Sequence, residues 1–310
     1  MNIMFFGTPD FAVPCLEMLI NEGYNVNAVV TQPDKKCGRG QKLSPTPVKE
    51  TALSNGIEVY QPETLKDGSL MPVLEKHSPE MIVVVAYGKI LPEYILSYPK
   101  YGCVNVHASL LPKLRGAAPI QWSIINGYDK TGVTTMLMDK GMDTGDILYK
   151  SVIDIEESDN SETLFNKLKL LGAELLKTTV VKLKEGKAVR IKQNDDEATY
   201  APMIMKKDAI IDWSEDYEKL VLKIRGLNPS PGAVTMAEGK RIKIYSAASG
   251  EPTDDKDYGK IWGYFEDKGL GIVAGGGIIY ITEIQPENSR RMPVSEYIKG
   301  HKIEPGEIWG

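Results

Sequence analysis

The sequence has few residues of the types that form disulfides and metal sites. It contains three cysteines, Cys15, Cys37 and Cys103, and three histidines in 310 residues. The cysteines are odd in number and widely spaced, which argues against a disulfide framework and against a zinc site. We therefore expect a protein that holds no metal and works in a reducing compartment such as the cytoplasm.

Long apolar runs and an excess of positive charge are missing as well. No segment approaches the roughly 18 apolar residues in a row that a membrane span needs, so no membrane association is expected. The first residues, MNIMFFGTPDF, lack a basic region and are interrupted by Gly7 and Pro9, so we expect a strand there and not a signal peptide. The net charge of −5 argues against a uniformly basic nucleic-acid binder but leaves room for a local basic patch.

Residues 1–190 alternate between strand and helix patterns. The run 81–86 is continuously apolar, which is typical of a central parallel strand covered on both faces. Repeated β–α units predict an α/β domain with a doubly wound, mostly parallel sheet. Its strands are expected at 2–7, 25–32, 57–62, 81–88 and 103–109, and its helices at 10–23 and 161–186.

The pattern changes after a polar segment, residues 191–206, which we expect to be a linker. Residues 207–310 contain short, glycine-bounded, β-rich segments and one clear helix pattern at 217–230. Such spacing predicts a second domain, a small β-barrel or a sandwich.

Asn105 and His107 stand two residues apart where a predicted strand ends. In open α/β sheets, ligands bind beyond the carboxyl ends of the strands. Side chains alternate between the two faces of a strand, so Asn105 and His107 should point to the same face. An amide can donate N–H bonds to a developing oxyanion and a neutral imidazole can accept a proton, which is what acyl-type transfer requires. Taken alone, however, such a pair is more often a structural hydrogen-bonding pair than a catalyst.

A third group for this site is expected in residues 138–148, MDKGMDTGDIL. This glycine-punctuated segment offers three carboxylates that can orient an imidazole, and Gly141 and Gly145 bracket the middle one. The carboxylates belong to Asp139, Asp143 and Asp146. Without further information, a simple turn is the more common explanation of this segment as well.

Taken together, these segments resemble the folate-dependent formyltransferases from end to end. The resemblance rests on FFGTPDFAVPCL, TQPDKKCGRGQKLSPTPVK, VVVAYGKILP, the stretch from NVHASLLP to MDTGDIL, and IRGLNPSPGA. It implies a Rossmann-like formyltransferase domain and a C-terminal OB-like β-barrel that binds tRNA. The departures are small: Met142 stands where the family often has Leu, and Cys37 precedes the Gly-Arg-Gly turn.

The same resemblance implies the substrates and the residues that serve them. Asn105, His107 and Asp143 fall on the family's catalytic triad, with 10-formyltetrahydrofolate as formyl donor and no metal. The acceptor would be the α-amino group of methionine on initiator tRNA, and the protein is expected to be a monomer. The folate-binding residues would be Tyr87, Gly88, Ile90, Ser109, Leu110, Leu111 and Pro112.

Residues 34–49 form a basic insert after the second predicted strand. They carry five basic residues against one acidic residue, a local charge of +4. The composition alone fits a solvated loop, but a charged segment beside the active-site edge also suits RNA, and the resemblance assigns it to the tRNA acceptor stem. The tRNA-binding residues are expected to be Lys35, Lys36, Arg39 and Lys42 in the insert and Lys206 and Lys207 in the second domain, with Lys240, Arg241 and Lys243 as a weaker candidate face.

Two other functions stay open on the sequence alone. Relatives with the same Asn/His/Asp core formylate small amines such as glycinamide ribonucleotide or an amino-sugar nucleotide, against which the basic insert argues. A non-catalytic RNA- or folate-binding protein with the same fold is the second alternative, against which the intact triad argues.

Overall fold

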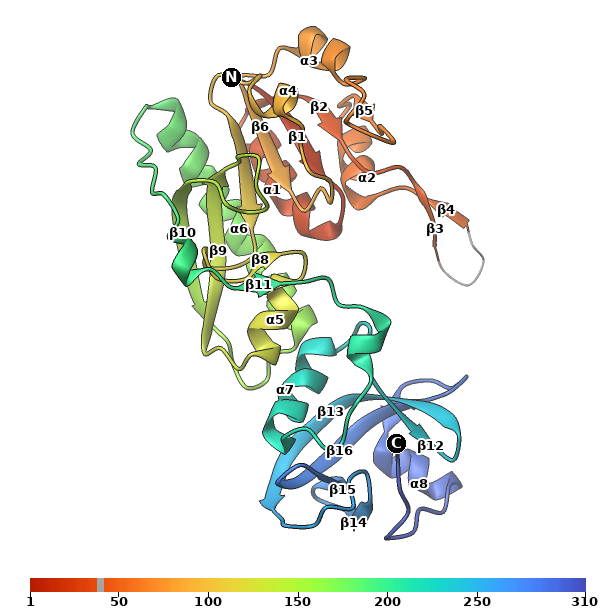
Figure 1. Cartoon of the computed structure of the whole chain (residues 1–310). Coiled ribbons are helices and arrows are strands. Elements are labelled where there is room, and N and C mark those ends of the chain that lie inside the picture. The colour runs from red at the N-terminus through yellow and green to blue at the C-terminus, as the bar shows by residue number, and fades with distance from the viewer. Residues whose placement is uncertain (38–41) are drawn as a thin grey trace. The chain divides into compact units, whose positions relative to one another are not determined.

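The computed structural model describes residues 1–37 and 42–310. Contacts divide the chain into two compact units (Figure 1). The first comprises Met1–Pro119, Lys130–Asp154 and Phe165–Pro202, and the second comprises Ile120–Asp129, Ile155–Leu164 and Met203–Gly310. The boundaries expected at residues 190 and 207 stay predictions.

A seven-stranded sheet forms the centre of the first unit, in the order β10-β9-β7-β6-β1-β2-β5. The strands β5, β2, β1, β6 and β7 are parallel, whereas β9 pairs antiparallel with both β7 and β10. The predicted doubly wound, mostly parallel sheet is therefore confirmed. The bounds are β1 (Asn2–Gly7), β2 (Asn25–Val30), β5 (Val59–Tyr60), β6 (Met81–Val85), β7 (Cys103–His107), β9 (Lys130–Leu137) and β10 (Ile147–Asp154).

Helices cover both faces of this sheet (Figure 1). Leu74 of α3 and Ile95 of α4 pack with Phe6 and Val84 on one face. On the other face, α6 approaches β7 so closely that a Cβ on Gly172 would lie 3.1 Å from Val106 Cγ1. The helical segments of the first unit are η1 (Asp10–Ala12), α1 (Val13–Asn21), α2 (Pro47–Ser54), α3 (Met71–His77), α4 (Glu93–Leu96) and most of α6 (Ser161–Lys184), whereas nearly all of α5 (Pro119–Ile125) belongs to the second unit.

Short elements extend the first unit beyond its sheet. β3 (Lys35–Cys37) and β4 (Lys42–Ser44) form a hairpin within the basic insert. β8 (Arg115–Gly116) pairs in parallel with β11 (Tyr200–Ala201), and η2 (Asp195–Glu197) precedes β11. The segment expected to be a linker therefore contains ordered, paired backbone.

An antiparallel sheet in the order β12-β13-β16-β15-β14 forms the second unit, and β17 pairs with β16. The second, β-rich domain expected from the sequence as a small barrel or sandwich is confirmed as an antiparallel sheet domain, with a core that includes Trp213, Leu220 and Trp309. The helix expected at 217–230 is α7, whereas the short α8 was not predicted. The bounds are η3 (Lys206–Ala209), α7 (Tyr217–Leu227), β12 (Ala233–Ala237), β13 (Lys240–Pro252), β14 (Ile261–Phe265), β15 (Gly269–Ala274), β16 (Gly277–Pro286), β17 (Met292–Pro293) and α8 (Val294–Gly300).

None of the helices in the described part of the chain is long and apolar enough to cross a membrane. Burial raises the pKa of the Cys15 and Cys103 thiols to about 12, so both stay protonated at neutral pH.

The long helix α6 begins with an asparagine cap. Asn160 Oδ1 accepts hydrogen bonds from the backbone N–H groups of Glu162, at 2.9 Å, and Thr163, at 3.0 Å. The backbone N–H of Asn160 in turn donates to Thr163 Oγ1 at 3.0 Å. Two N–H groups that a helix start leaves without a helical partner are thereby satisfied.

We expect Asn160→Ala to lower the free energy of unfolding by about 1 kcal/mol, because the alanine side chain cannot accept these bonds. Asn160→Asp keeps the acceptor and should stay within a few tenths of a kcal/mol of the parent protein. Urea denaturation followed by circular dichroism measures both variants. An alanine variant as stable as the aspartate variant would contradict the assigned cap.

Candidate active site

The strand β7 brings Asn105 and His107 to one face of the sheet. Cys103, on the same face, packs against the side of α3 and α4, whereas Val106 faces α6. Asn105 is 8% exposed and His107 is 6% exposed. The predicted side-by-side placement of an amide and an imidazole is therefore present, in a nearly buried setting.

The hydrogen bonds of His107 fix the tautomer of its neutral imidazole. Nε2 lies 3.0 Å from the carbonyl oxygen of Leu114, which can only accept, so Nε2 carries the hydrogen and donates it. Nδ1 is then the nitrogen with a lone pair. It lies 3.7 Å from Asp143 Oδ1. A proton taken up by His107 would therefore reside next to a carboxylate.

Of the three carboxylates in residues 138–148, only that of Asp143 approaches His107. Its other oxygen, Oδ2, accepts the Gly116 N–H at 2.9 Å. Asp143 has φ of +56°, in the left-handed region that Asp and Asn tolerate better than most residues. Asp139 instead bonds within the turn, through Gly141 N and Thr144 Oγ1, at 3.0 and 2.6 Å.

The side chain of Asn105 makes no hydrogen bond with any residue that the structure describes. Because Asn105 stands two positions before His107 on the same face, its N–H groups are available to a ligand next to that imidazole.

Residues 108–114 form a turn that is held by hydroxyl groups. Ser109 Oγ donates to the Lys113 carbonyl at 2.6 Å, and Thr134 Oγ1 donates to the Ser109 carbonyl at 2.6 Å. Leu111 is buried against Met136 and Ile147. The side chains of Ser109 and Leu111 therefore support the turn, and contact with folate by this segment, including Leu110 and Pro112, stays a prediction.

The loop after β6 lies beside this turn, because β6 and β7 are neighbouring parallel strands. The Tyr87 ring is buried, and burial raises the pKa of its phenol to about 12. Gly88, with φ of +82°, and Ile90, which is 73% exposed, remain accessible in the loop. The Tyr87 ring therefore packs in the core, whereas Gly88 and Ile90 offer surface to a ligand, and the folate role of all three stays a prediction.

The base of the basic insert is fixed by a polar cluster. Lys49 Nζ bonds Asp34 Oδ2 at 2.6 Å and Gln61 Oε1 at 2.7 Å, and Gln61 Nε2 donates to Asp34 Oδ1 at 2.7 Å. The hydrogen bonds from Lys49 and then Gln61 lower the pKa of Asp34. The charge of Lys49 is thus paired with Asp34, whereas Lys35 and Lys36 are exposed on the hairpin.

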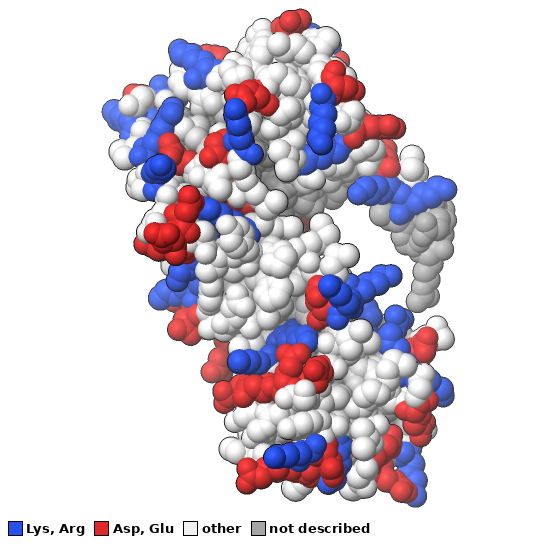
Figure 2. Space-filling model, in the orientation of Figure 1, with Lys and Arg blue, Asp and Glu red and all other residues white. Residues whose placement is uncertain are grey.

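Figure 2 shows basic side chains at the hairpin, whereas both signs of charge are interspersed over the rest of the visible face. Arg39 lies outside the described residues, and for Lys42 the structure gives only the backbone, in β4. In the second unit, Lys206 and Lys207 are exposed on η3. A role of these residues in tRNA binding stays a prediction.

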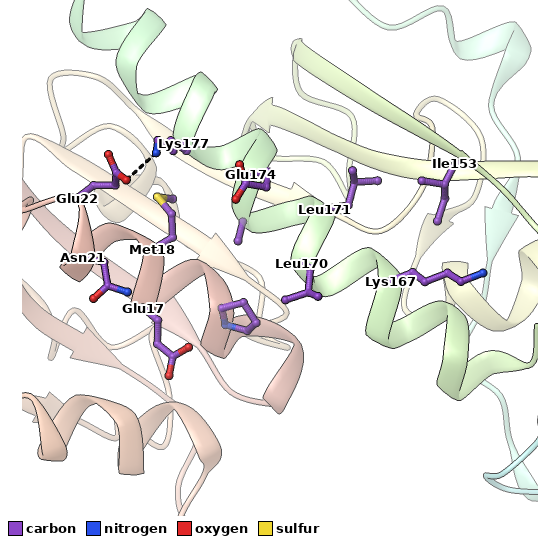
Figure 3. Close-up of a pocket in the computed structure, with 12 residues that line it drawn as sticks. Glu17, Met18, Asn21, Glu22, Ile153, Lys167, Leu170, Leu171, Glu174 and Lys177 are labelled. Atoms are coloured by element: carbon purple, nitrogen blue, oxygen red, sulfur yellow. Dashed lines mark hydrogen bonds and ion pairs between the residues drawn. The ribbon is translucent and has the colours of Figure 1, made fainter.

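A separate groove of about 610 Å³ lies between α1 and α6 on the opposite face of the sheet (Figure 3). The ion pair of Lys177 with Glu22, at 2.6 Å, crosses it. It contains none of the candidate site residues. The lining consists of Pro14, Glu17, Met18, Asn21, Glu22, Ile153, Lys167, Leu170, Leu171, Ala173, Glu174 and Lys177.

Within residues 1–37 and 42–310, no group of three or more His, Cys, Asp or Glu side chains is arranged to hold a metal ion. The expectation of a metal-independent site stays a prediction.

Two family models together match nearly the whole chain. The formyl transferase model matches residues 1–180, and the formyl transferase C-terminal domain model matches residues 203–302. The chain belongs to the formyl transferase family. The site at the end of β7 therefore lies in the formyl transferase domain, and the antiparallel sheet forms the family's C-terminal domain.

Individual formyl transferases agree with this assignment. The chain is 53% identical over 309 residues to a methionyl-tRNA formyltransferase of Caldanaerobacter subterraneus subsp. tengcongensis, covering 99% of each protein. It is 46% identical over 309 residues to that of Syntrophus aciditrophicus, covering 100% of this chain and 99% of the relative. The solved structure of HypX from Aquifex aeolicus in complex with tetrahydrofolic acid is similar in fold, with a TM-score of 0.61 and 16% identity, over 96% of this chain and 46% of HypX.

The sequence did not single out two residues that hold the site together. Gly116 donates its backbone N–H to Asp143, and Gln193 donates its side-chain amide to the Asp143 carbonyl at 2.7 Å. Gly116 lies in the sequence between His107 and Asp143, and its closeness to His107 in the chain was a usable signal. Gln193 lies in the polar segment expected to be a linker, where no local pattern marks it.

We expect Gly145→Ala to lower kcat of formyl transfer by about tenfold or more, because a 1 Å displacement of a catalytic group can cost up to about a hundredfold. A Cβ at residue 145 would overlap the Leu137 carbonyl oxygen and push the turn that carries Asp143 away from β9. Gly300→Ala is the control, since its Cβ would have no neighbour within 4 Å. Steady-state kinetics measures both, and equal activity of the two variants would contradict this account.

Proposed function

We propose that the chain transfers the formyl group of 10-formyltetrahydrofolate to the α-amino group of methionyl initiator tRNA, as a cytoplasmic monomer. The observation that carries the proposal is the unit formed by His107, Asp143 and the Asn105 amide, which has no hydrogen-bond partner among the described residues. Full-length similarity to methionyl-tRNA formyltransferases at 53% and 46% identity supports the acceptor. Tetrahydrofolic acid in the HypX structure supports the donor class.

The chemistry requires a neutral amine, since only its lone pair can form the new bond to the formyl carbon. An α-amino group has a reference pKa of about 7.7–8.0, so a useful fraction is neutral near physiological pH. When bound, the donor supplies the formyl carbon, and its bond to N10 breaks as the new C–N bond forms. The amine loses one proton in this exchange, and N10 gains one.

The residues at the end of β7 match these needs. Asn105 can donate an N–H to the formyl oxygen, on which negative charge develops, and so stabilise the transition state. His107 can take the amine proton on Nδ1, because Nε2–H is engaged by the Leu114 carbonyl. Asp143, with Oδ1 at 3.7 Å from Nδ1, then stabilises the imidazolium until the proton moves on towards N10.

The loop after β6 and the turn after β7 are suited to hold the donor. A flat pterin needs apolar walls and backbone groups that can approach it closely. The exposed Ile90 offers an apolar surface, and Gly88 lacks the Cβ that would keep a ring away from the backbone. The Tyr87 carbonyl is occupied by Gln32 Nε2 at 3.0 Å, which steadies the loop.

The basic hairpin is suited to bind the acceptor tRNA through its phosphates. Lys35 and Lys36 are exposed, and the Lys49–Asp34–Gln61 cluster anchors the hairpin's base. Lysines of this kind hold a phosphate backbone without reading sequence. Incubation of the protein with 10-formyltetrahydrofolate and methionyl initiator tRNA, followed by detection of formylmethionine, tests the whole proposal. A small amine such as glycinamide ribonucleotide as the better acceptor would overturn it.

For the catalytic unit, we expect Asn105→Ala, His107→Ala and Asp143→Ala each to lower kcat by roughly 10² or more. The losses should not add in double variants, because the three residues act together and each substitution disables the same catalytic unit. Single-turnover kinetics measures the chemical step, and circular dichroism confirms that the variants are folded. Activity of His107→Ala equal to that of the parent protein would refute the assigned proton acceptor.

For the hairpin, we expect Lys35→Ala with Lys36→Ala to weaken tRNA binding and to lower its salt dependence by up to about one unit per lost phosphate contact. KM for the folate donor should hardly change, since folate is held elsewhere. Lys184→Ala, at the exposed end of α6, is the control for loss of one lysine charge. Filter binding of tRNA at several salt concentrations measures the slope. An unchanged slope in the double variant would remove these lysines from the tRNA site.

A further inference from the structure

A buried arginine stands behind the turn that carries Asp143. Arg115 is 2% exposed, and its Nε and Nη2 donate to Gln193 Oε1 at 3.1 and 2.8 Å. Nη2 also lies 2.8 Å from Asp195 Oδ1. The guanidinium therefore fixes which end of the Gln193 amide is oxygen and which is nitrogen, because it can only donate.

The nitrogen of Gln193 is consequently directed at the turn. Nε2 donates to the Asp143 carbonyl at 2.7 Å and to the Gly145 carbonyl at 2.8 Å. Gln193 is 6% exposed, so these bonds are shielded from competing water. One buried amide thus donates hydrogen bonds to the backbone on both sides of residue 144, directly beside the left-handed Asp143.

We propose that Gln193, oriented by Arg115, is a positioning residue for formyl transfer. It holds the Asp143 and Gly145 carbonyls so that the Asp143 carboxylate keeps facing His107 Nδ1. The inference rests on the proposed function, because it assigns Asp143 a part in the reaction. Gln193 does not itself touch the reacting atoms.

A purely structural role, holding residues 191–201 against the rest of the first unit, does not require Gln193. Thr199 accepts from the Leu114 N–H with its hydroxyl and from the Arg115 N–H with its carbonyl, both at 2.9 Å. The Ala201 carbonyl accepts the Ala118 N–H at 3.1 Å. These bonds keep the segment attached when the Gln193 side chain is changed.

Gln193→Glu is the sharpest test, because glutamate has the same shape but cannot donate. It keeps an acceptor for Arg115 and places a carboxylate oxygen against two carbonyl oxygens, so the turn should be released while the protein stays folded. Gln193→Ala removes the side chain altogether. Asp196→Ala is the matched control: it is exposed, close in sequence, and its side chain makes no hydrogen bond with the described residues.

Kinetics on two backgrounds measures whether Gln193 acts through Asp143. In the parent background, Gln193→Glu and Gln193→Ala should lower kcat by about ten- to a hundredfold with nearly unchanged KM values. In the Asp143→Ala background, the same substitutions should cause no further loss. An unchanged kcat in the parent background, or an equal fractional loss in both backgrounds, would overturn the inference. Absence of formyl transfer by the unmodified protein would instead overturn the proposed function.

A spectroscopic readout tests the positioning without relying on activity. The chain has only three histidines, so His107 can be followed by imidazole ¹⁵N NMR with His77 and His301 as internal references. In Gln193→Glu, the His107 resonances should move towards their positions in Asp143→Ala, whereas the other two histidines and Asp196→Ala should show no change. His107 resonances that stay in place in Gln193→Glu would overturn the inference.

Discussion

The contact between Asp143 and His107 depends on a backbone that is left-handed at residue 143. That conformation turns the carboxylate so that Oδ1 lies 3.7 Å from Nδ1 of His107, while Oδ2 takes the Gly116 N–H. Left-handed residues other than glycine persist where the surrounding structure holds them in place. Here the surroundings are β9, against which Gly145 packs without a side chain, and the amide of Gln193. Strand β7 supplies the opposite side of the contact by fixing His107.

Burial strengthens the attraction between the Asp143 carboxylate and a protonated His107. The imidazole is 6% exposed, and its Nε2–H donates to the Leu114 carbonyl. A second proton can therefore bind only at Nδ1. A charge that appears there meets a nearby carboxylate in a setting where water screens it weakly. The neighbouring Asn105 amide, by contrast, makes no hydrogen bond with the residues that the structure describes, so its N–H groups are free to bind a ligand.

The sequence predicted the features that depend on local pattern. The apolar run at β6 predicted a central parallel strand, and alternation along β7 predicted that Asn105 and His107 share a face. Choosing Asp143 from three carboxylates required the family resemblance, because the choice depends on turn geometry and not on spacing. Gln193 could not be found, since the two carbonyls that it binds lie 50 and 48 positions away in the chain and Arg115 lies 78 positions away. The resemblance also has a limit. It predicted folate contact for Tyr87 but did not reveal that the Tyr87 ring packs in the core.

The two tasks that the proposed function assigns to the first unit place different demands on structure. Proton transfer needs fixed distances, and the residues beside His107 are accordingly buried and hydrogen-bonded at several points. The proposed attraction of a phosphate backbone needs charge but little geometry, and Lys35 and Lys36 are exposed on the hairpin. Gln32 links the two regions, since it follows β2 on the path to the hairpin and donates to the Tyr87 carbonyl in the loop after β6. Under the proposed function, a net charge of −5 with a local basic segment would direct polyanions to the hairpin and away from the rest of the surface.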